Sequence, residues 1–428
     1  MSEAPFRRAR LRAVTREVDA VDDLLEYAAA QRPTVWSRRG DILVGVDALH
    51  EFVGAPNVGS AHLADAWRDL VSRAEIDDPV GVPGTGLVGF GALPFDPRSA
   101  RGGRLTVPRT ILGRRGGRSW VTHITSIDTP DAGPVDAQLP AATPYGPHWS
   151  ATLGPGSLTP DGYQGAVREA LEAIASRTVS KVVIARDLVG SVPPGSDLRR
   201  LVRALATAYP DTWTFAVDGL IGASPETLVT VSGGTVTARV LAGTAARGAD
   251  PDADTAASVA LATSPKDLDE HQYAVQSVLS ALRPHTSTLA SQEQPFMLKL
   301  PNVWHLATDV EGALAADASA LDLVGALHPT AAVAGTPTDA AIELIDRLEP
   351  FDRGRYAGPV GWIDAAGGGE WAIALRCAQF DLDVIPSDGT DRIPFTAHAG
   401  AGIVGGSDPE AEMLETRVKF RPIVDALA

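Results

Sequence analysis

Two pairs of carboxylates stand at a spacing that places each pair on one face of a helix. Asp267 and Glu270 are three residues apart, and so are Glu412 and Glu415. If the two pairs converge, their oxygens suit Mg²⁺, which binds one or two carboxylates, keeps several waters and leaves room for an anionic ligand. The alternative for either pair is an acidic helix face in contact with solvent.

A lysine and a glutamate in apolar surroundings have the chemistry of proton transfer. Lys181 begins the apolar run KVVIARDL, and Glu226 lies in the turn GASPETLV. Burial lowers the pKa of a lysine and raises that of a glutamate. The result is an amine that can accept a proton and an acid that can donate one. A lysine that reaches solvent from a strand end and an ordinary turn glutamate remain the alternatives.

A glycine-rich stretch, GAGIVGG at residues 400–406, precedes the second acidic pair. Its backbone amides could bind an anion. It lacks the lysine and hydroxyl residue that end a P-loop, so a phosphate site is not expected.

The elements that must position these residues are short strands and a few long helices, without the regular alternation of a nucleotide-binding fold. Thr159 and Pro160 begin one helix with a capping residue and an early proline. Gly233 and Gly234 indicate a hairpin turn. We therefore predict an α+β fold with large antiparallel β-sheets flanked by helices. The expected helices are 61–74, 159–176, 264–282 and 408–427, and the expected strands or hairpins lie in 41–49, 84–96, 119–127, 181–190, 213–243, 358–382 and 397–406, with a loop at 128–157.

Composition excludes several classes of protein. The chain has 428 residues, and its 37 Lys+Arg against 53 Asp+Glu give a net charge of -16, which disfavours a nucleic-acid or anionic-membrane partner. A single cysteine permits no internal disulfide. We find neither a signal peptide nor 18 consecutive apolar residues, so we expect a soluble cytoplasmic protein that does not enter the membrane. The basic residues include only four lysines: Lys181, Lys266, Lys299 and Lys419.

Nine ordered segments carry further motifs. They are KVVIARDL, GASPETLV, LAGTAARG, SPKDLDEH, NVWHLATDVEG, LHPTAAVAGTP, EPFDRGRYAGPVGW, IALRCAQF and AGAGIVGGSDPEAEMLETRVK. This set resembles the chorismate-utilising enzymes over residues 160–428, and GLVGFGALPFD extends the resemblance loosely into the N-terminal half.

The resemblance implies a reaction and its proton carriers. Family members that use ammonia lack a lysine at the position of Lys181, whereas isochorismate and salicylate synthases have one that activates water. Lys181 would therefore deprotonate water for attack at carbon 2 of chorismate, and Glu226 would protonate the hydroxyl that leaves carbon 4. The segment LHPT favours isochorismate synthase, although Ala331 stands where those enzymes usually have proline. Salicylate synthase and a non-catalytic binding homologue remain the alternatives.

The resemblance also implies the ligand sites. Glu270 and Glu415 match the Mg²⁺ ligands, with Asp267 and Glu412 holding metal-bound waters. The remaining matches are substrate-binding residues, some for the carboxylates of chorismate and some for the ring or the order of the pocket: Gly243, Thr244, His305, Tyr356, Arg376, Gly402 and Lys419.

We expect one large domain, 1–428, with an N-terminal sheet portion at 1–130 and a chorismate-binding catalytic portion at 155–428. A water-using member of this family needs no ammonia-supplying partner, so a monomer is expected. Its product would enter menaquinone or siderophore synthesis, depending on the neighbouring enzymes. Lys299 has no expected role.

Overall fold

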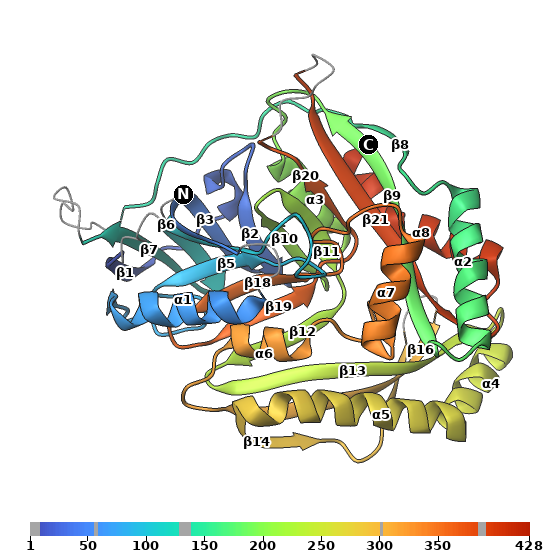
Figure 1. Cartoon of the computed structure of the whole chain (residues 1–428). Coiled ribbons are helices and arrows are strands. Elements are labelled where there is room, and N and C mark those ends of the chain that lie inside the picture. The colour runs from blue at the N-terminus through green and yellow to red at the C-terminus, as the bar shows by residue number, and fades with distance from the viewer. Residues whose placement is uncertain (1–8, 55–58, 128–137, 300–302, 384–390) are drawn as a thin grey trace, which may run out of the picture.

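The computed structural model describes residues 9–54, 59–127, 138–299, 303–383 and 391–428. Its strands join into one hydrogen-bonded network. Of the strand pairs in the described chain, only β1 with β4 is parallel. Helices pack around this network (Figure 1). The predicted α+β class, with antiparallel sheets and flanking helices, is confirmed.

The strands form two rows that diverge from β6, which pairs with β3 and β7 in one row and with β5 in the other. In pairing order, the first row is β4 (Glu75–Asp77), β1 (Leu11–Val18), β7 (Arg118–Ser126), β6 (Arg104–Arg115), β3 (Asp41–Val53), β2 (Thr34–Arg38), β10 (Trp213–Val217), β11 (Leu220–Ser224), β20 (Cys377–Phe380), β21 (Ile393–Val404) and β9 (Lys181–Val192), with β8 (Thr152–Pro155) and β17 (Gly335–Thr336) on the outer edge of β9.

The second row also starts beside β6 and ends in a long antiparallel pair of strands, β13 with β16. In pairing order it is β5 (Val88–Ala92), β18 (Pro359–Asp364), β19 (Gly369–Ile373), β12 (Thr227–Ser232), β13 (Thr235–Ala246) and β16 (Val303–Leu314), which also pairs with β14 (Thr286–Ser291) and β15 (Phe296–Lys299).

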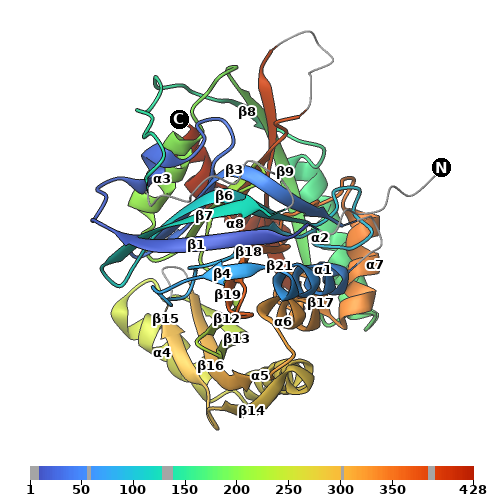
Figure 2. The same ribbon diagram turned by 90° about the vertical axis from the view of Figure 1, so that its left-hand side faces the viewer.

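Helices cover both rows. In Figure 1, α2, α7 and α8 lie beside β9 and β21, and α5 lies below β13. Figure 2 shows the strands β3, β6, β7 and β1 above α6, α4 and α5. The helices are α1 (Ser60–Ser72), α2 (Pro160–Ala175), α3 (Arg199–Ala208), α4 (Pro251–Ala262), α5 (Pro265–Leu282), α6 (Ala320–Leu327), α7 (Thr338–Leu348) and α8 (Pro409–Leu427), with 3-10 turns η1 (Leu24–Tyr27) and η2 (Arg283–His285).

Local sequence explains the elements that were predicted. The Thr159 side chain accepts a hydrogen bond from the Gly162 amide and Pro160 occupies the first turn, so α2 begins where expected. Gly233 and Gly234 have φ of 56° and 79°, which a two-residue hairpin turn requires. The helices α1, α2, α5 and α8 confirm the prediction.

Other elements differ from the prediction. The helices α3, α4, α6 and α7 are not among the predicted elements; they have 8 to 12 residues, so each offers only two or three turns in which a periodic pattern can be recognised. The expected loop at 128–157 contains the short strand β8, which pairs with β9. Its first part, 128–137, lies outside the described residues.

Strands from the N-terminal part pair directly with later ones. β2 pairs with β10, and β5 pairs with β18. The expected boundaries at 130 and 155 stay predictions. Within the described part of the chain, none of the helices is long and apolar enough to cross a membrane.

Two apolar cores hold the rows and helices together. The larger core includes Trp36, Trp67, Trp120, Trp362 and Trp371, which are all at most 2% exposed. The second core lies beneath α3 and the C-terminal half of α8. Because aromatic side chains bury a large area each, these tryptophans supply much of the apolar contact in the larger core.

Candidate active site

The chain crosses from the first row to the second directly at Glu226, which stands between β11 and β12. The Glu226 amide donates to Ser224 Oγ (3.2 Å), and Ser224 Oγ donates to the Ile373 carbonyl (2.5 Å). The Ile373 amide donates back to the Glu226 carbonyl (3.1 Å). The chain returns at Arg376, whose carbonyl accepts from the Ala223 amide (3.2 Å). These paired crossings fix the backbone on both sides of Glu226.

Lys181 lies at the first position of β9, and its side chain passes over Gly402 on β21. A Cβ atom at Gly402 would stand 3.1 Å from Lys181 Cε and 3.8 Å from its Nζ. Glycine at 402 therefore leaves the space that the lysine side chain occupies. This contact between β9 and β21 brings together two of the residues predicted from the sequence.

The charges of Lys181 and Lys419 both act on Glu226. Burial raises the pKa of the Glu226 carboxyl group, and the two lysine charges oppose that rise. His305 responds to the same pair: burial lowers the pKa of its ring, and the charges of Lys181 and Lys419 lower it further. These four residues, which come from separate motifs, therefore share one electrostatic environment.

A bulge in the second row lies beside His305. The register between β13 and β16 shifts at Gly243, which has φ of 78°, a value that favours glycine. A Cβ atom there would stand 3.0 Å from Leu306 and 3.5 Å from Asp267 Cβ. Thr244 pairs with His305 across the two strands. The Thr244 side chain lies outside the described residues.

Lys419 lies on α8, one turn after Glu415. Its Nζ donates to the Gly400 carbonyl (2.8 Å) and forms an ion pair with Glu415 Oε1 (2.7 Å). Glu415 is one of the predicted metal ligands, and Gly400 begins the glycine-rich stretch that contains Gly402. The lysine is therefore held by β21 and α8 together.

The four predicted carboxylates occupy α5 and α8. Burial and the charge of Glu415 raise the pKa of Glu412, although a hydrogen bond from Ser407 lowers it. Asp267 lies in the first turn of α5 against the Gly243 bulge. The Glu270 side chain lies outside the described residues, and among the rest of the described chain no cluster of three metal-ligating side chains occurs.

Tyr356 and Arg376 occupy different surroundings. The Tyr356 ring stacks on His398 with centroids 5.1 Å apart, and burial, with a contribution from Glu226, raises the pKa of its hydroxyl. Burial lowers the pKa of Arg376, and the residue that opposes this is Tyr209 at the end of α3. Tyr356 therefore shares the environment of Glu226, whereas the placement of Arg376 toward substrate stays a prediction.

Three polar residues near the site were not predicted. Tyr163 on α2 donates to the Ile184 carbonyl of β9 (3.2 Å), and burial and the charges of Glu412 and Glu415 raise its pKa. Ser224 supports Glu226 as described. His271 on α5 lies 3.0 Å from the Ala242 carbonyl, next to the bulge. Ser224 and His271 lie within the motifs GASPETLV and SPKDLDEH but received no role, and Tyr163 lies on the apolar face of the predicted helix.

Lys299, which had no expected role, lies away from this group. Its Nζ stands 3.9 Å from Asp254 Oδ2 and 5.4 Å from the centre of the Trp304 ring. Arg247 forms a second ion pair with Asp254, with its Nε 2.5 Å from Oδ1. Lys299 thus belongs to a cluster that joins α4 to the paired strands β13 and β16.

The chain matches the family described as chorismate binding enzymes over residues 3–428. The isochorismate synthase DhbC of Bacillus subtilis is 40% identical over 280 residues, which are 63% of this chain and 68% of that one. A vibriobactin-specific isochorismate synthase of Vibrio cholerae is 29% identical over 416 residues, 95% of this chain and 94% of that one.

Solved structures show the same architecture. MenF, the menaquinone-specific isochorismate synthase from Escherichia coli, has a TM-score of 0.73 and 26% identity, and the match covers 97% of this chain and 94% of that one. Anthranilate synthase component I from Streptococcus pneumoniae shares the fold, with a TM-score of 0.65 and 20% identity over 94% of this chain and 95% of that one.

Proposed function

We propose that this chain, which belongs to the chorismate-binding enzymes, converts chorismate into isochorismate and that Lys181 and Glu226 carry the two proton transfers; relatives named isochorismate synthases support the activity. The reaction is an isomerisation: a hydroxyl group is added at ring carbon 2, another leaves carbon 4, and the ring double bonds move between them. Each transfer can contribute about 10² to 10⁴ in rate.

Lys181 acts as the general base in this proposal. Its Nζ takes a proton from the water molecule that attacks carbon 2. The observation that supports this most directly is the joint effect of the Lys181 and Lys419 charges on Glu226 and His305, which come from distant motifs. Arginine could supply the charge of Lys181 but not its basicity.

Glu226 acts as the general acid. Its burial raises its pKa, which keeps the carboxyl group protonated to higher pH than a solvent-exposed glutamate. The hydrogen bonds that join it to Ser224 and Ile373 fix its backbone. A protonated and fixed carboxyl group can give its proton to the hydroxyl that leaves carbon 4.

The substrate carries two carboxylates, which need positive charge and hydrogen-bond donors. We propose that Arg376, Tyr356, Lys419 and the Gly402 amide bind them, with the arginine offering a planar pair of donors. Gly243, Thr244 and His305 would line the ring. This assignment is supported for Tyr356, Lys419 and His305, which share the electrostatic environment of Glu226.

We also propose that Glu270 and Glu415 bind Mg²⁺, with Asp267 and Glu412 holding its waters. The donor set fits this ion, because it consists of hard carboxylate oxygens. Glu412 and Glu415 lie one turn apart on α8; burial raises the pKa of Glu412 and the charge of Glu415 raises it further, and a bound cation would favour the charged form of both. When bound, Mg²⁺ would anchor the ring carboxylate and withdraw charge from the ring.

Product analysis tests the proposed function. The purified protein is incubated with chorismate, with and without Mg²⁺, and the products are separated by chromatography. We expect isochorismate, which has the mass of chorismate, to form only when Mg²⁺ is present. Activity that survives a chelator would contradict the metal assignment.

The same assay distinguishes the neighbouring activity. A salicylate synthase would release pyruvate and form fluorescent salicylate in equal amounts. Salicylate and pyruvate without a partner enzyme would therefore contradict the assignment of isochorismate as the final product. The monomeric state expected from the sequence stays a prediction, and size-exclusion chromatography of the same sample tests it.

A further inference from the structure

The strand that carries Lys181 has an incomplete outer edge. On this edge β17 pairs with β9 only at Lys181 and Val182, and β8 pairs only from Leu188 to Ser191. Between these two short partners, no strand of the described chain pairs with the outer edge of β9. The backbone groups there must find other partners, since a buried and unpaired amide or carbonyl is costly.

Two side chains, Glu349 and Arg353, occupy this gap. Glu349 Oε1 accepts a hydrogen bond from the Ala185 amide (2.7 Å), and Arg353 donates to the Val183 carbonyl (2.7 Å). The two side chains also bond to each other, with distances of 2.8 and 2.5 Å. They are 1% and 3% exposed. A charged pair thus does here what a neighbouring strand does elsewhere.

The same pair connects β9 to the other segments of the site. Arg353 donates to the Val333 carbonyl (3.0 Å), in the segment that leads into β17 and so to the partner of Lys181. The Arg353 carbonyl accepts from the Tyr356 amide (3.0 Å). Glu349 follows the last residue of α7. One buried carboxylate and one buried guanidinium therefore hold the outer edge of β9 at Val183 and Ala185, while β21 pairs with its other edge.

We infer that Glu349 and Arg353 are positioning residues, which set the place of Lys181 relative to Glu226 by completing the outer edge of β9. This inference rests on the proposed role of Lys181 as the base. A general base must lie within hydrogen-bond reach of the proton that it takes, so a displaced strand lowers the rate of the chemical step without removing any group that binds chorismate.

Three variants test this inference: Glu349→Ala, Glu349→Gln and Arg353→Lys. Alanine removes the acceptor of the Ala185 amide, so we expect kcat to fall about 10- to 100-fold, while the Kd for chorismate, measured by calorimetry, changes less than about threefold. Glutamine keeps an acceptor oxygen, so Glu349→Gln should recover most of kcat even if its Tm falls. Lysine cannot reach both Val183 and Val333, so Arg353→Lys should lower kcat about tenfold.

Asp197 provides a matched control. It is also a buried carboxylate that accepts a backbone amide, from Gly146 (2.9 Å), and pairs with an arginine, but it lies away from β9. We expect Asp197→Ala to lower Tm and to leave kcat per folded molecule unchanged. A fall in kcat common to Asp197→Ala and Glu349→Ala would mean that any lost buried pair impairs the enzyme, and would overturn the inference.

The remaining outcomes are distinct. If Glu349→Ala and Arg353→Lys both keep the wild-type kcat per folded molecule, the inference is wrong and the proposed function stands. If Glu349→Ala does not fold, the kcat of Arg353→Lys per folded molecule alone tests the inference, and a wild-type value contradicts it. If Lys181→Gln keeps its turnover, the proposed base is wrong, and the inference fails with it whatever the other variants show.

Discussion

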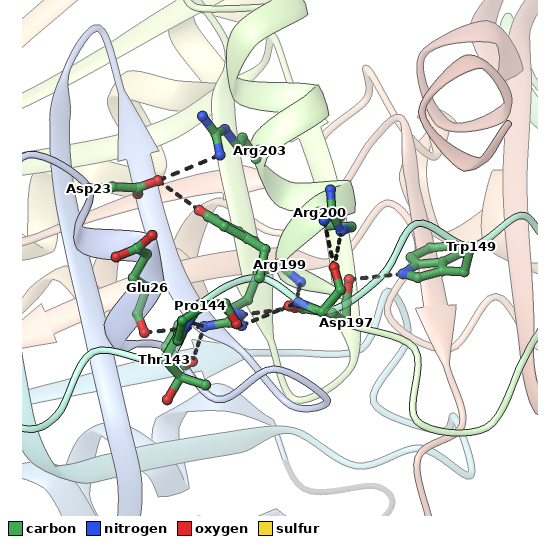
Figure 3. A network of polar contacts seen from close by, with 12 residues as sticks. Asp23, Glu26, Thr143, Pro144, Trp149, Asp197, Arg199, Arg200 and Arg203 are labelled. Atoms are coloured by element: carbon green, nitrogen blue, oxygen red, sulfur yellow. Dashed lines mark hydrogen bonds and ion pairs between the residues drawn. The ribbon is translucent and has the colours of Figure 1, made fainter.

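Two groups of buried charges in this molecule have opposite arrangements. Asp197 and Arg199 are 3% and 0% exposed and bond to each other and to the backbone (Figure 3). Arg199 donates to the carbonyls of Glu26, Thr143 and Pro144 at 2.9 to 3.1 Å. The hydrogen bonds of this guanidinium therefore lie inside the protein and join chain segments that are far apart in the sequence.

The charges of the candidate active site are arranged differently. Glu226 is fixed through its backbone, and its carboxyl group lies in the field of Lys181 and Lys419. Lys181 passes over a glycine that leaves it space. Here hydrogen bonds from neighbouring residues hold the backbone of Glu226, and the charges of Lys181 and Lys419 act on its carboxyl group.

The difference teaches how a buried charge is used. A buried charge with all its partners inside the protein fixes chain segments in place, and removing one partner leaves the other uncompensated. Groups whose pKa values are shifted by burial and by nearby charges are suited to proton transfer. Glu349 and Arg353 connect the two groups. They form a buried pair whose hydrogen bonds lie inside the protein, and this pair supports the strand that carries the proposed base.

Replacing the base should have the largest effect. Lys181→Gln removes the amine that deprotonates water, so we expect kcat to fall about 10² to 10⁴-fold. Chorismate binding, measured by calorimetry, and Tm should remain close to those of the wild type. Turnover at the wild-type rate would show that this lysine belongs with the structural charges instead.

Breaking the buried pair of Asp197 with Arg199 should lower stability without changing kcat. Arg199→Met leaves Asp197 buried without its partner, so we expect the free energy of unfolding, measured in urea, to fall by about 3 to 5 kcal/mol. The kcat of the folded protein should not change. Arg239→Met serves as the control, because the pair of Arg239 with Asp309 is 46% and 43% exposed and should contribute at most about 1 kcal/mol. Equal losses in the two variants would contradict the distinction.

The pH dependence of kcat probes the charges around Glu226. The acid must be protonated, so kcat should fall by about tenfold per pH unit as the pH rises above the raised pKa of Glu226. Lys419→Gln removes one of the two positive charges that lower this pKa, so the fall should move to higher pH. Lys299→Gln is the control, since this lysine lies beside Asp254 and should not move it. A shift to lower pH in Lys419→Gln would contradict the assignment of Glu226 as the acid.

The smallest expected effect concerns the space beneath Lys181. In Gly402→Ala the added Cβ would lie 3.1 Å from Lys181 Cε, so the lysine must move by a few tenths of an ångström. We expect kcat to fall about three- to tenfold. Gly154→Ala, where a Cβ meets nothing within 4 Å, should leave kcat unchanged. Equal rates in both variants would show that the position of the lysine tolerates this displacement.

Sequence motifs predicted more of the site than of the fold around it. Lys181, Glu226, His305 and Lys419 were singled out from motifs and share one environment. Glu349 and Arg353 belong to a recognised motif but received no role, because their partners are the backbone of β9, which no side-chain pattern reveals.

The sequence by itself determined the local structure and the chemical types present. Helix caps, hairpin glycines and alternating apolar residues act over a few positions, so they could be read directly, and the motifs specify the family. The tertiary structure alone decided which of these residues meet. The charge of Lys181 acts on Glu226 because the chain crosses between two rows of strands at that residue, and the pKa of Glu226 is raised because its carboxyl group is buried. Both effects depend on strand pairing over long distances and on burial, neither of which a short stretch of sequence contains.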